Sequence, residues 1–126
     1  MSGASNREIV EALWSAFDAL DFDVAGELLH DDFVCEWPQS QERIVGRVNF
    51  VAVNKHYPGE WRIEIVKLVT SGPEVVTETL LRYGDQTARA VSFFELRDGK
   101  IARLREFWPD PYEAPDWRAP WVERTG

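Results

Sequence analysis

Residues 86–108 read QTARAVSFFELRDGKIARLREFW, and this stretch decides the fold. From Gln86 to Leu96, two sets of side chains alternate with the period of two that is typical of a β-strand. Asp98-Gly99 is a strong hairpin signal, and a second alternating run follows from Lys100 to Trp108. The stretch therefore predicts a long antiparallel hairpin. One face of it carries Ala88, Ala90, Ser92, Phe94, Ala102, Leu104, Glu106 and Trp108.

Two more alternating segments precede this hairpin. The segment Trp61–Thr70 ends at the turn signal Ser71-Gly72-Pro73, and the segment Glu74–Tyr83 ends at Gly84-Asp85. Four alternating segments joined by short turns predict an antiparallel meander. Within the second of these two segments, one face carries Thr77, Thr79, Leu81 and Tyr83.

The first half of the chain is mainly helical in pattern. Ser5 followed by Glu8 is a capping box, and apolar residues then recur at helical spacing. Asp23 is expected to cap a second helix. The predicted elements are a helix from about Asn6 to Leu20, a shorter helix through Leu29, a strand Phe33–Trp37 closed by Pro38, a polar turn-like stretch 39–46, and a helix from Gly46 to His56.

Helices first and a long meander last predict the α+β class. The length of 126 residues indicates one domain, residues 1–126. We expect a cone-shaped, strongly curved antiparallel sheet with the N-terminal helices packed on its concave face around a pocket. The outer face mixes charged residues with apolar ones and is either an association surface or a solvated face. Its predicted apolar members are Leu80, Val91, Phe93 and Ile101.

Composition narrows the classes of partner. A net charge of −8 argues against nucleic acid, since phosphate contacts need clustered Lys and Arg, and against an anionic membrane surface. The one cysteine, Cys35, rules out an intrachain disulfide and a Cys-x-x-Cys metal site. No apolar run has the length of a signal peptide or a membrane span, so we expect a cytoplasmic protein. Six Trp indicate a lined cavity or an interface, or else aromatic filler in a large core.

In this order of elements, four stretches resemble the nuclear transport factor 2-like superfamily, whose fold is also called cystatin-like. Its SnoaL-like polyketide cyclases and ketosteroid isomerase-like proteins are the nearest branch. The stretches are EALWSAFDALDFD (11–23), ELLHDDFV (27–34), FFELRDGKI (93–101) and EFW (106–108). The resemblance covers residues 5 to about 110. It implies a cone-shaped α+β barrel, usually a homodimer joined through the sheet, with a pocket between the helices and the concave face.

The resemblance also implies which positions to inspect. The isomerase's helix tyrosine falls on Trp14, its aspartate base on Trp37, and its protonated aspartate on Ser92. None of these three acid–base groups is kept, so the resemblance does not imply steroid isomerisation here. The SnoaL-like cyclases imply an acid–base carboxylate on a late strand and no cofactor, and Glu106 is the nearest match.

Glu106 is therefore the main candidate for a catalytic residue. Among apolar neighbours its pKa would rise toward the value that a general acid or base needs. Ser92, Trp14 and Tyr83 are the expected donors for a developing oxyanion. The alternative places Glu106 at the mouth of the cone, paired with Arg105 or Arg43 in solvent. The side chains expected to line the pocket and bind a ligand are Trp14, Phe17, Trp37, Thr79, Leu81, Tyr83, Ala90, Phe94, Leu104 and Trp108.

Two histidines are further candidates for a functional role. His56 ends the third predicted helix, where it is either a proton shuttle or a residue that favours the helix dipole. His30 is interpreted as structural. Asp31 and Asp32 beside it are interpreted as an exposed acidic turn, because further ligands for a metal have no evident source. We therefore expect no metal, and the resemblance implies no cofactor.

Residues 109–126 form a Pro- and Trp-rich C-terminal arm. Prolines at 109, 111, 115 and 120 prevent it from adding a strand to the sheet. Its aromatic residues either cap the pocket, or grip a neighbouring subunit, or pack against the chain's own helices. These residues are Tyr112, Trp117 and Trp121, with Arg118 available for stacking.

Three functions remain open at this point. The first is a cofactor-independent enzyme that performs proton abstraction, cyclisation or isomerisation on a small apolar or aromatic molecule, with Glu106 as the acid–base residue. The second is a module that binds such a molecule without catalysis. The third is a structural dimerisation domain.

Overall fold

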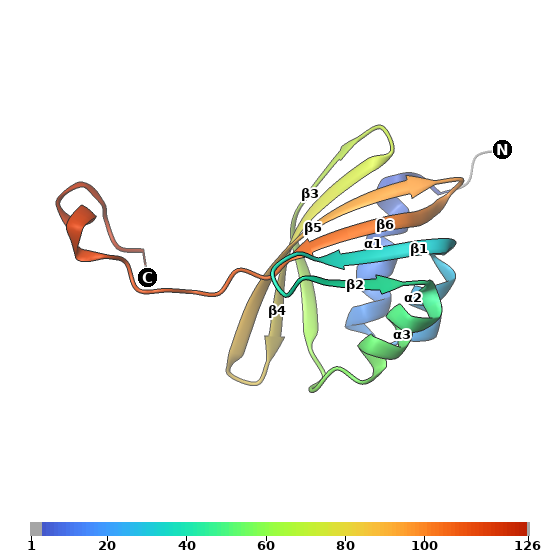
Figure 1. The fold of residues 1–126 in the computed structure, drawn as a ribbon, viewed down its shortest axis with the longest axis horizontal. Helices are drawn as coiled ribbons and strands as arrows, with labels where there is room; N and C mark the ends of the chain where they lie inside the picture. Colours follow the sequence, from blue (N-terminus) through green and yellow to red (C-terminus); the bar gives the residue numbers. More distant parts are fainter. Residues whose placement is uncertain (1–3, 126) are drawn as a thin grey trace.

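The computed structural model describes residues 4–125 and has a helical layer packed on one curved sheet (Figure 1). The helices are α1 (Asn6–Asp18), α2 (Phe22–Glu27), α3 (Arg47–Lys55) and a 3-10 helix η1 (Asp116–Trp121). The strands are β1 (Leu29–Trp37), β2 (Glu42–Val45), β3 (Arg62–Ser71), β4 (Glu74–Tyr83), β5 (Gln86–Arg97) and β6 (Lys100–Phe107). The predicted α+β fold with helices on one face of a curved sheet is confirmed.

The predicted capping box begins α1. Ser5 Oγ accepts a hydrogen bond from the Glu8 N–H, and Glu8 Oε1 accepts one from the Ser5 N–H, at 3.2 and 3.0 Å. The buried side of α1 then faces the sheet. Asp21, and not Asp23 as predicted, caps α2, because its Oδ1 accepts from the Val24 N–H.

The six strands are ordered β2-β1-β6-β5-β4-β3. The antiparallel meander β3 to β6 is confirmed, and so is the burial of its inward residues along β4 and β5. The sheet departs from the prediction at its other edge. β1 starts at Leu29 and runs parallel to β6, and β2 occupies part of the stretch predicted as a turn. The sheet is open, with β2 and β3 at its edges.

A local irregularity corrects one predicted face. The pairing of β5 with β6 shifts register between Glu95 and Leu96. Ile101, which strict alternation assigns to the outer face, is fully buried in the core as a result. The other predicted apolar members of that face, Leu80, Val91 and Phe93, keep partial or full exposure.

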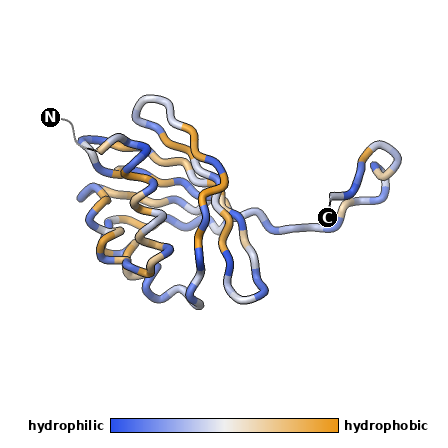
Figure 2. Tube along the Cα trace, turned by 180° about the vertical axis from the view of Figure 1, so that it is seen from behind, coloured by the Kyte–Doolittle hydropathy of each residue, from blue (hydrophilic) through white to orange (hydrophobic). Residues whose placement is uncertain are grey.

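The core lies between the concave face and the helices, and the arm leaves on the opposite side (Figures 1 and 2). Aromatic rings connect the two layers: Phe17 of α1 lies 6.0 Å from Phe50 of α3, which lies 5.0 Å from Phe33 of β1. Within residues 4–125, no helix is both long and apolar enough to cross a membrane. Cys35 is a buried thiol whose pKa is raised, mainly by burial.

The C-terminal arm makes none of the contacts with the helices that one prediction assigned to it. It runs away from the domain and ends in η1. Tyr112, Trp117 and Trp121 are 80%, 72% and 78% exposed. The arm therefore neither caps the pocket nor packs on the chain's own helices.

One polar contact joins the end of α1 to the start of β3. The Arg62 guanidinium donates two hydrogen bonds of 2.9 Å to the Asp18 carboxylate, and the Ile63 N–H donates a third at 2.8 Å. These contacts, with that of Arg62 the largest, lower the pKa of Asp18 from 3.8 to about 2. The contact holds the helical layer on the edge of the sheet, beside the pocket lining that Ile63 provides.

Asp18→Asn is therefore expected to lower the free energy of unfolding at pH 7 by about 1 kcal/mol, a value discounted because the carboxylate is partly exposed. The folded pKa is depressed, so this contribution is present above pH 3.8 and is lost as pH falls toward 2. Urea unfolding of both proteins at pH 7 and near pH 2 measures the difference. A difference that stays constant with pH would contradict this assignment.

Candidate functional site

The strand register places four side chains in one row across the concave face. Thr77 of β4 pairs with Ser92 of β5, and Ser92 pairs with Glu106 of β6. The parallel pairing of β1 with β6 continues the row to Trp37, because Glu36 pairs with Arg105 one residue earlier. Trp37 joins the other three members of this polar row because β1 pairs in parallel with β6.

Hydrogen bonds connect the members of the polar row. Ser92 Oγ donates to Glu106 Oε2 at 2.8 Å, and Trp37 Nε1 donates to Glu106 Oε1 at 3.1 Å. At the other end, Trp14 Nε1 of α1 donates to Thr77 Oγ1 at 3.1 Å. Each oxygen of the Glu106 carboxyl group thus has one protein donor, and the group is held in a fixed orientation.

Glu106 is buried, with only 4% of its surface exposed. Burial raises its pKa above the ordinary value of 4.5, and the bonds from Ser92 and Trp37 offset only part of this rise. The alternative that pairs Glu106 with a surface arginine is wrong. Arg105 lies over the rings of Phe93 and Phe107 on the outer face, and Arg43 forms its ion pair with Glu36.

A cavity opens beside Glu106, between the helices and the sheet. Its cavity volume is about 100 Å³. Six of the predicted site residues line it: Trp14, Phe17, Trp37, Leu81, Glu106 and Trp108. Sequence analysis missed the other lining residues, which are Leu20, Phe22, Phe50, Asn54, Tyr57, Gly59, Trp61, Ile63 and Ala88. The wall is therefore largely aromatic and carries one carboxyl group.

The missed residues come mostly from helix ends and turns. Trp61 is the clearest case: its indole N–H donates to the Pro58 carbonyl at 3.0 Å, and its ring lies 5.5 Å from that of Tyr83. Gly59 has a positive φ of 90°, and a Cβ there would come within 3.0 Å of the Tyr83 ring. The Tyr57-Pro58-Gly59 turn signal and the adjacent Trp61 were the available signals for this wall of the cavity.

The remaining predicted residues lie outside the lining of this cavity. Thr79, Ala90, Phe94 and Leu104 are buried in the wall behind it, and Tyr83 is 45% exposed at the end of β4. Thr79 Oγ1 is buried and has no hydrogen-bond partner within the described part of the chain. Ser92 reaches the site through its bond to Glu106.

The structure does not bring His56 to the cavity. His56 caps α3 with an exposed side chain whose Nδ1 lies 2.8 Å from the Ala52 carbonyl oxygen. A role as proton shuttle for Glu106 therefore has no geometric support, and the interpretation as a helix-end residue fits its position.

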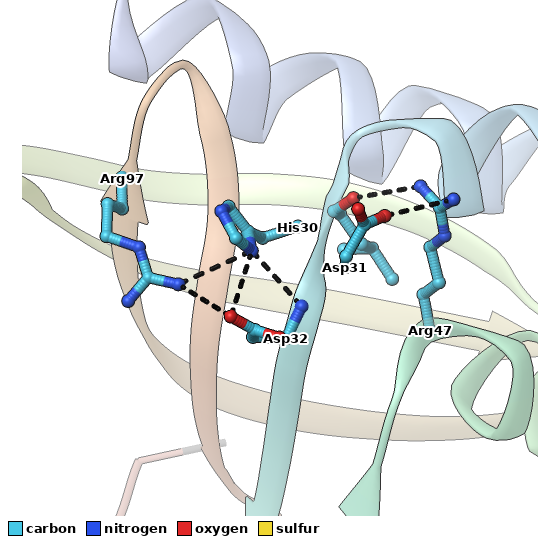
Figure 3. A network of polar contacts seen from close by, with 6 residues as sticks. His30, Asp31, Asp32, Arg47 and Arg97 are labelled. Carbon is cyan, nitrogen blue, oxygen red and sulfur yellow. Dashed lines mark hydrogen bonds and ion pairs between the residues drawn. The ribbon is translucent and has the colours of Figure 1, made fainter.

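His30 belongs to a separate polar network at the start of β1 (Figure 3). The Asp32 N–H donates to His30 Nδ1 at 3.1 Å, and Arg97 Nη2 lies 3.4 Å from the same nitrogen. Asp31 forms an ion pair with Arg47 at 3.1 Å. These residues lie in a strand and not in the predicted acidic turn. Across residues 4–125, no group of His, Cys, Asp and Glu is arranged to hold a metal.

The family model described as "SnoaL-like domain" matches residues 10–104 of this chain. The chain belongs to the SnoaL-like domain family. The resemblance inferred from the sequence is thereby confirmed for the family and its fold. A search of curated proteins gave no match for this SnoaL-like domain.

Solved structures agree with this membership. A candidate ketosteroid isomerase from Kribbella flavida DSM 17836 is 32% identical, with a TM-score of 0.92 over 96% of this chain and 90% of that one. An NTF-2 like protein of unknown function from Burkholderia xenovorans LB400 is 38% identical, with a TM-score of 0.82 over 96% and 95%. An LEH-like epoxide hydrolase from M. tuberculosis is 26% identical, with a TM-score of 0.69 over 82% of each chain.

The site of this SnoaL-like domain is suited to proton transfer by Glu106. A carboxyl group with a raised pKa in an apolar wall gives up or accepts a proton closer to neutral pH than a free glutamate does. Its two donors hold it in place while it does so. Polar groups of a bound molecule would meet an aromatic surface and this one acid.

Replacement of Glu106 by the neutral isostere Gln is expected to stabilise the fold increasingly as pH rises. The folded pKa is raised, so ionisation above it opposes folding in the wild type, whereas Gln carries no charge. The stability difference should grow by about 1.4 kcal/mol for each pH unit above 4.5 until the folded pKa is passed.

Urea unfolding between pH 4.5 and pH 8 measures this difference. The matched control is Glu95→Gln, an exposed carboxylate on the same strand pair. It should show no such trend. Parallel stability profiles for wild type and Glu106→Gln would disprove the raised pKa.

Proposed function

We propose that this chain is a cofactor-independent enzyme that transfers a proton on a small, neutral, apolar or aromatic molecule. The reaction class is isomerisation, cyclisation or elimination, with Glu106 as the acid–base residue. The observation that carries the proposal is the position of Glu106: a buried carboxyl group with a raised pKa in the wall of an aromatic cavity.

The lining of the cavity supports a neutral ligand. Four tryptophan rings contribute to it, and none of the lining residues is Lys, Arg or His. An anionic molecule would therefore meet a carboxyl group without any compensating cation. Flat apolar molecules gain from burial against the indole faces. The ketosteroid and the epoxide named for the two similar proteins are both small organic molecules, which agrees with this class.

A proton-transfer step follows from this arrangement. The ionised Glu106 takes a proton from a carbon next to a carbonyl group, which leaves an enolate, and the protonated Glu106 then returns the proton to another atom of the same molecule. The expected oxyanion donors are occupied or misplaced: Ser92 donates to Glu106, Trp14 donates to Thr77, and Tyr83 lies outside the lining. Tyr57 brings a phenol to the lining and is the donor we propose in their place.

One observation favours the second candidate function, a module that binds without catalysis. Both oxygens of Glu106 already accept a hydrogen bond from the protein, as the oxygens of a structural buried carboxyl group do. In that case the cavity holds the molecule and Glu106 only fixes β1 against β6.

We also propose that the chain is a homodimer joined through the outer face of the sheet and works in the cytoplasm. Supporting the dimer, Phe93 and Phe107 lie on that face with rings 6.1 Å apart, covered by Arg105. Supporting the compartment, Cys35 is a buried free thiol.

Exchange of the C1 protons of 2-tetralone in D₂O, followed by NMR, tests the enzyme proposal. The wild type should accelerate exchange over buffer, and Glu106→Gln should lose at least about 100-fold of that rate because the acid–base group is removed. Glu95→Gln should keep the full rate.

Binding of 2-naphthol, followed by tryptophan fluorescence, separates the two functions. Glu106→Gln should keep the affinity within a few-fold, since the aromatic wall is intact. Binding without any exchange by the wild type would favour the module over the enzyme. Neither binding nor exchange would reject both.

A further inference from the structure

The C-terminal arm carries three large aromatic residues that its own domain does not bury. Its three large aromatic residues are each more than 70% exposed. We propose that the arm is an inter-subunit strap: in a homodimer, Trp117 and Trp121 of each chain pack on the outer sheet face of a second copy. The inference rests on the dimer proposed above and is independent of the chemistry of Glu106.

The rest of the domain holds the chain up to Trp108, the residue that precedes the arm, and makes no hydrogen bond or ion pair with residues 110–125. The Trp108 N–H donates to Gln39 Oε1, and this contact holds the root of the arm. Beyond it, the hydrogen bond and ion pair of residues 110–125 stay within the arm: Val122 N–H to the Ala119 carbonyl, and Arg124 to Glu113. A single six-residue 3-10 helix with exposed tryptophans is not stable by itself in water. Within residues 4–125, the rest of the domain supplies no hydrogen bond or ion pair that would stabilise it.

A second observation is that the arm falls within the match to a crystallised relative. The match to the Kribbella flavida crystal structure covers 96% of the 126 residues, so about five residues lie outside it and most of the arm lies inside it. Most of the arm therefore has an aligned counterpart in that crystallised relative.

The chemistry of the outer face fits that of the arm. Residues 110–125 carry four acids and two arginines, a net charge of −2. The outer face exposes Arg103 and Arg105 beside the rings of Phe93 and Phe107. Arg105 already lies 5.2 Å from the Phe93 ring centroid, so a further indole can stack on the same guanidinium. Tryptophan and arginine are the residues that contribute most to protein interfaces.

The position of the arm selects a second copy as the partner. The arm continues directly from β6, whose outward residue Phe107 belongs to the group of rings and arginines on the outer face. It leaves on the side of the sheet away from the helices (Figures 1 and 2). A two-fold axis through the outer face places the root of each arm beside the other copy's group of rings and arginines. Each chain then supplies one arm and one docking face. The same arm-to-face contact therefore forms twice in the dimer.

Photo-crosslinking tests the strap directly. The photoreactive residue p-benzoyl-phenylalanine replaces Trp117 in the full chain, and ¹⁵N-labelled and unlabelled protein are mixed before irradiation. We expect a covalent dimer in which the labelled arm is joined to unlabelled peptides of β5 or β6. Crosslinks to the chain's own domain only, or to no peptide, would overturn the proposal.

Sedimentation equilibrium supplies the energetic test. Trp117→Ala with Trp121→Ala should raise the dimer dissociation constant at least tenfold, whereas Val48→Ala, an exposed residue of α3 on the helical side, should leave it unchanged. A dimer of unchanged affinity would reject the strap but keep the dimer. A monomeric wild type would reject both, and neither result bears on proton transfer by Glu106.

Discussion

The structure depends on the burial of one carboxyl group in the middle of a sheet. Glu106 has almost no contact with solvent, and a carboxyl group in that position needs a donor for each oxygen. Ser92 on one neighbouring strand and Trp37 on the other supply them. Both donors are in place only when β5 and β1 flank β6 in the observed register. A slip of one residue would turn Glu106 to the outer face and leave the donors unpaired.

The same constraint links the architecture to its proposed chemistry. The indole of Trp37 serves both as a donor to Glu106 and as part of the cavity wall, so the acid is oriented by the surface that would bind a ligand. Burial among the surrounding side chains raises the pKa of Glu106. On the other side of the sheet, aromatic rings and arginines gather where the arm begins. Proton transfer and association are thus assigned to opposite faces of one sheet.

The sequence predicted those parts of the structure that local patterns determine. Alternation over residues 61–108 located β3 to β6 and the inward position of Glu106, and the capping box located the start of α1. It did not predict the parallel pairing of β1 with β6 or the four-residue β2, because long-range pairing and a short charged edge strand leave no periodic signal. Nine of the fifteen residues that line the cavity were missed for a related reason. Residues such as Trp61 and Asn54 reach it from turns and helix ends, whose positions depend on tertiary packing.

The central claim is that Glu106 is buried in an aromatic wall, where its protonated form is favoured. The most direct measurement is the pKa of its side-chain carboxyl carbon, followed by ¹³C NMR and assigned by comparison with Glu106→Gln. The account predicts a single carboxyl resonance that titrates clearly above 4.5 and is absent from the variant. A Glu106 resonance that titrates at or below 4.5 would contradict the account, because it would describe a solvated or ion-paired carboxylate.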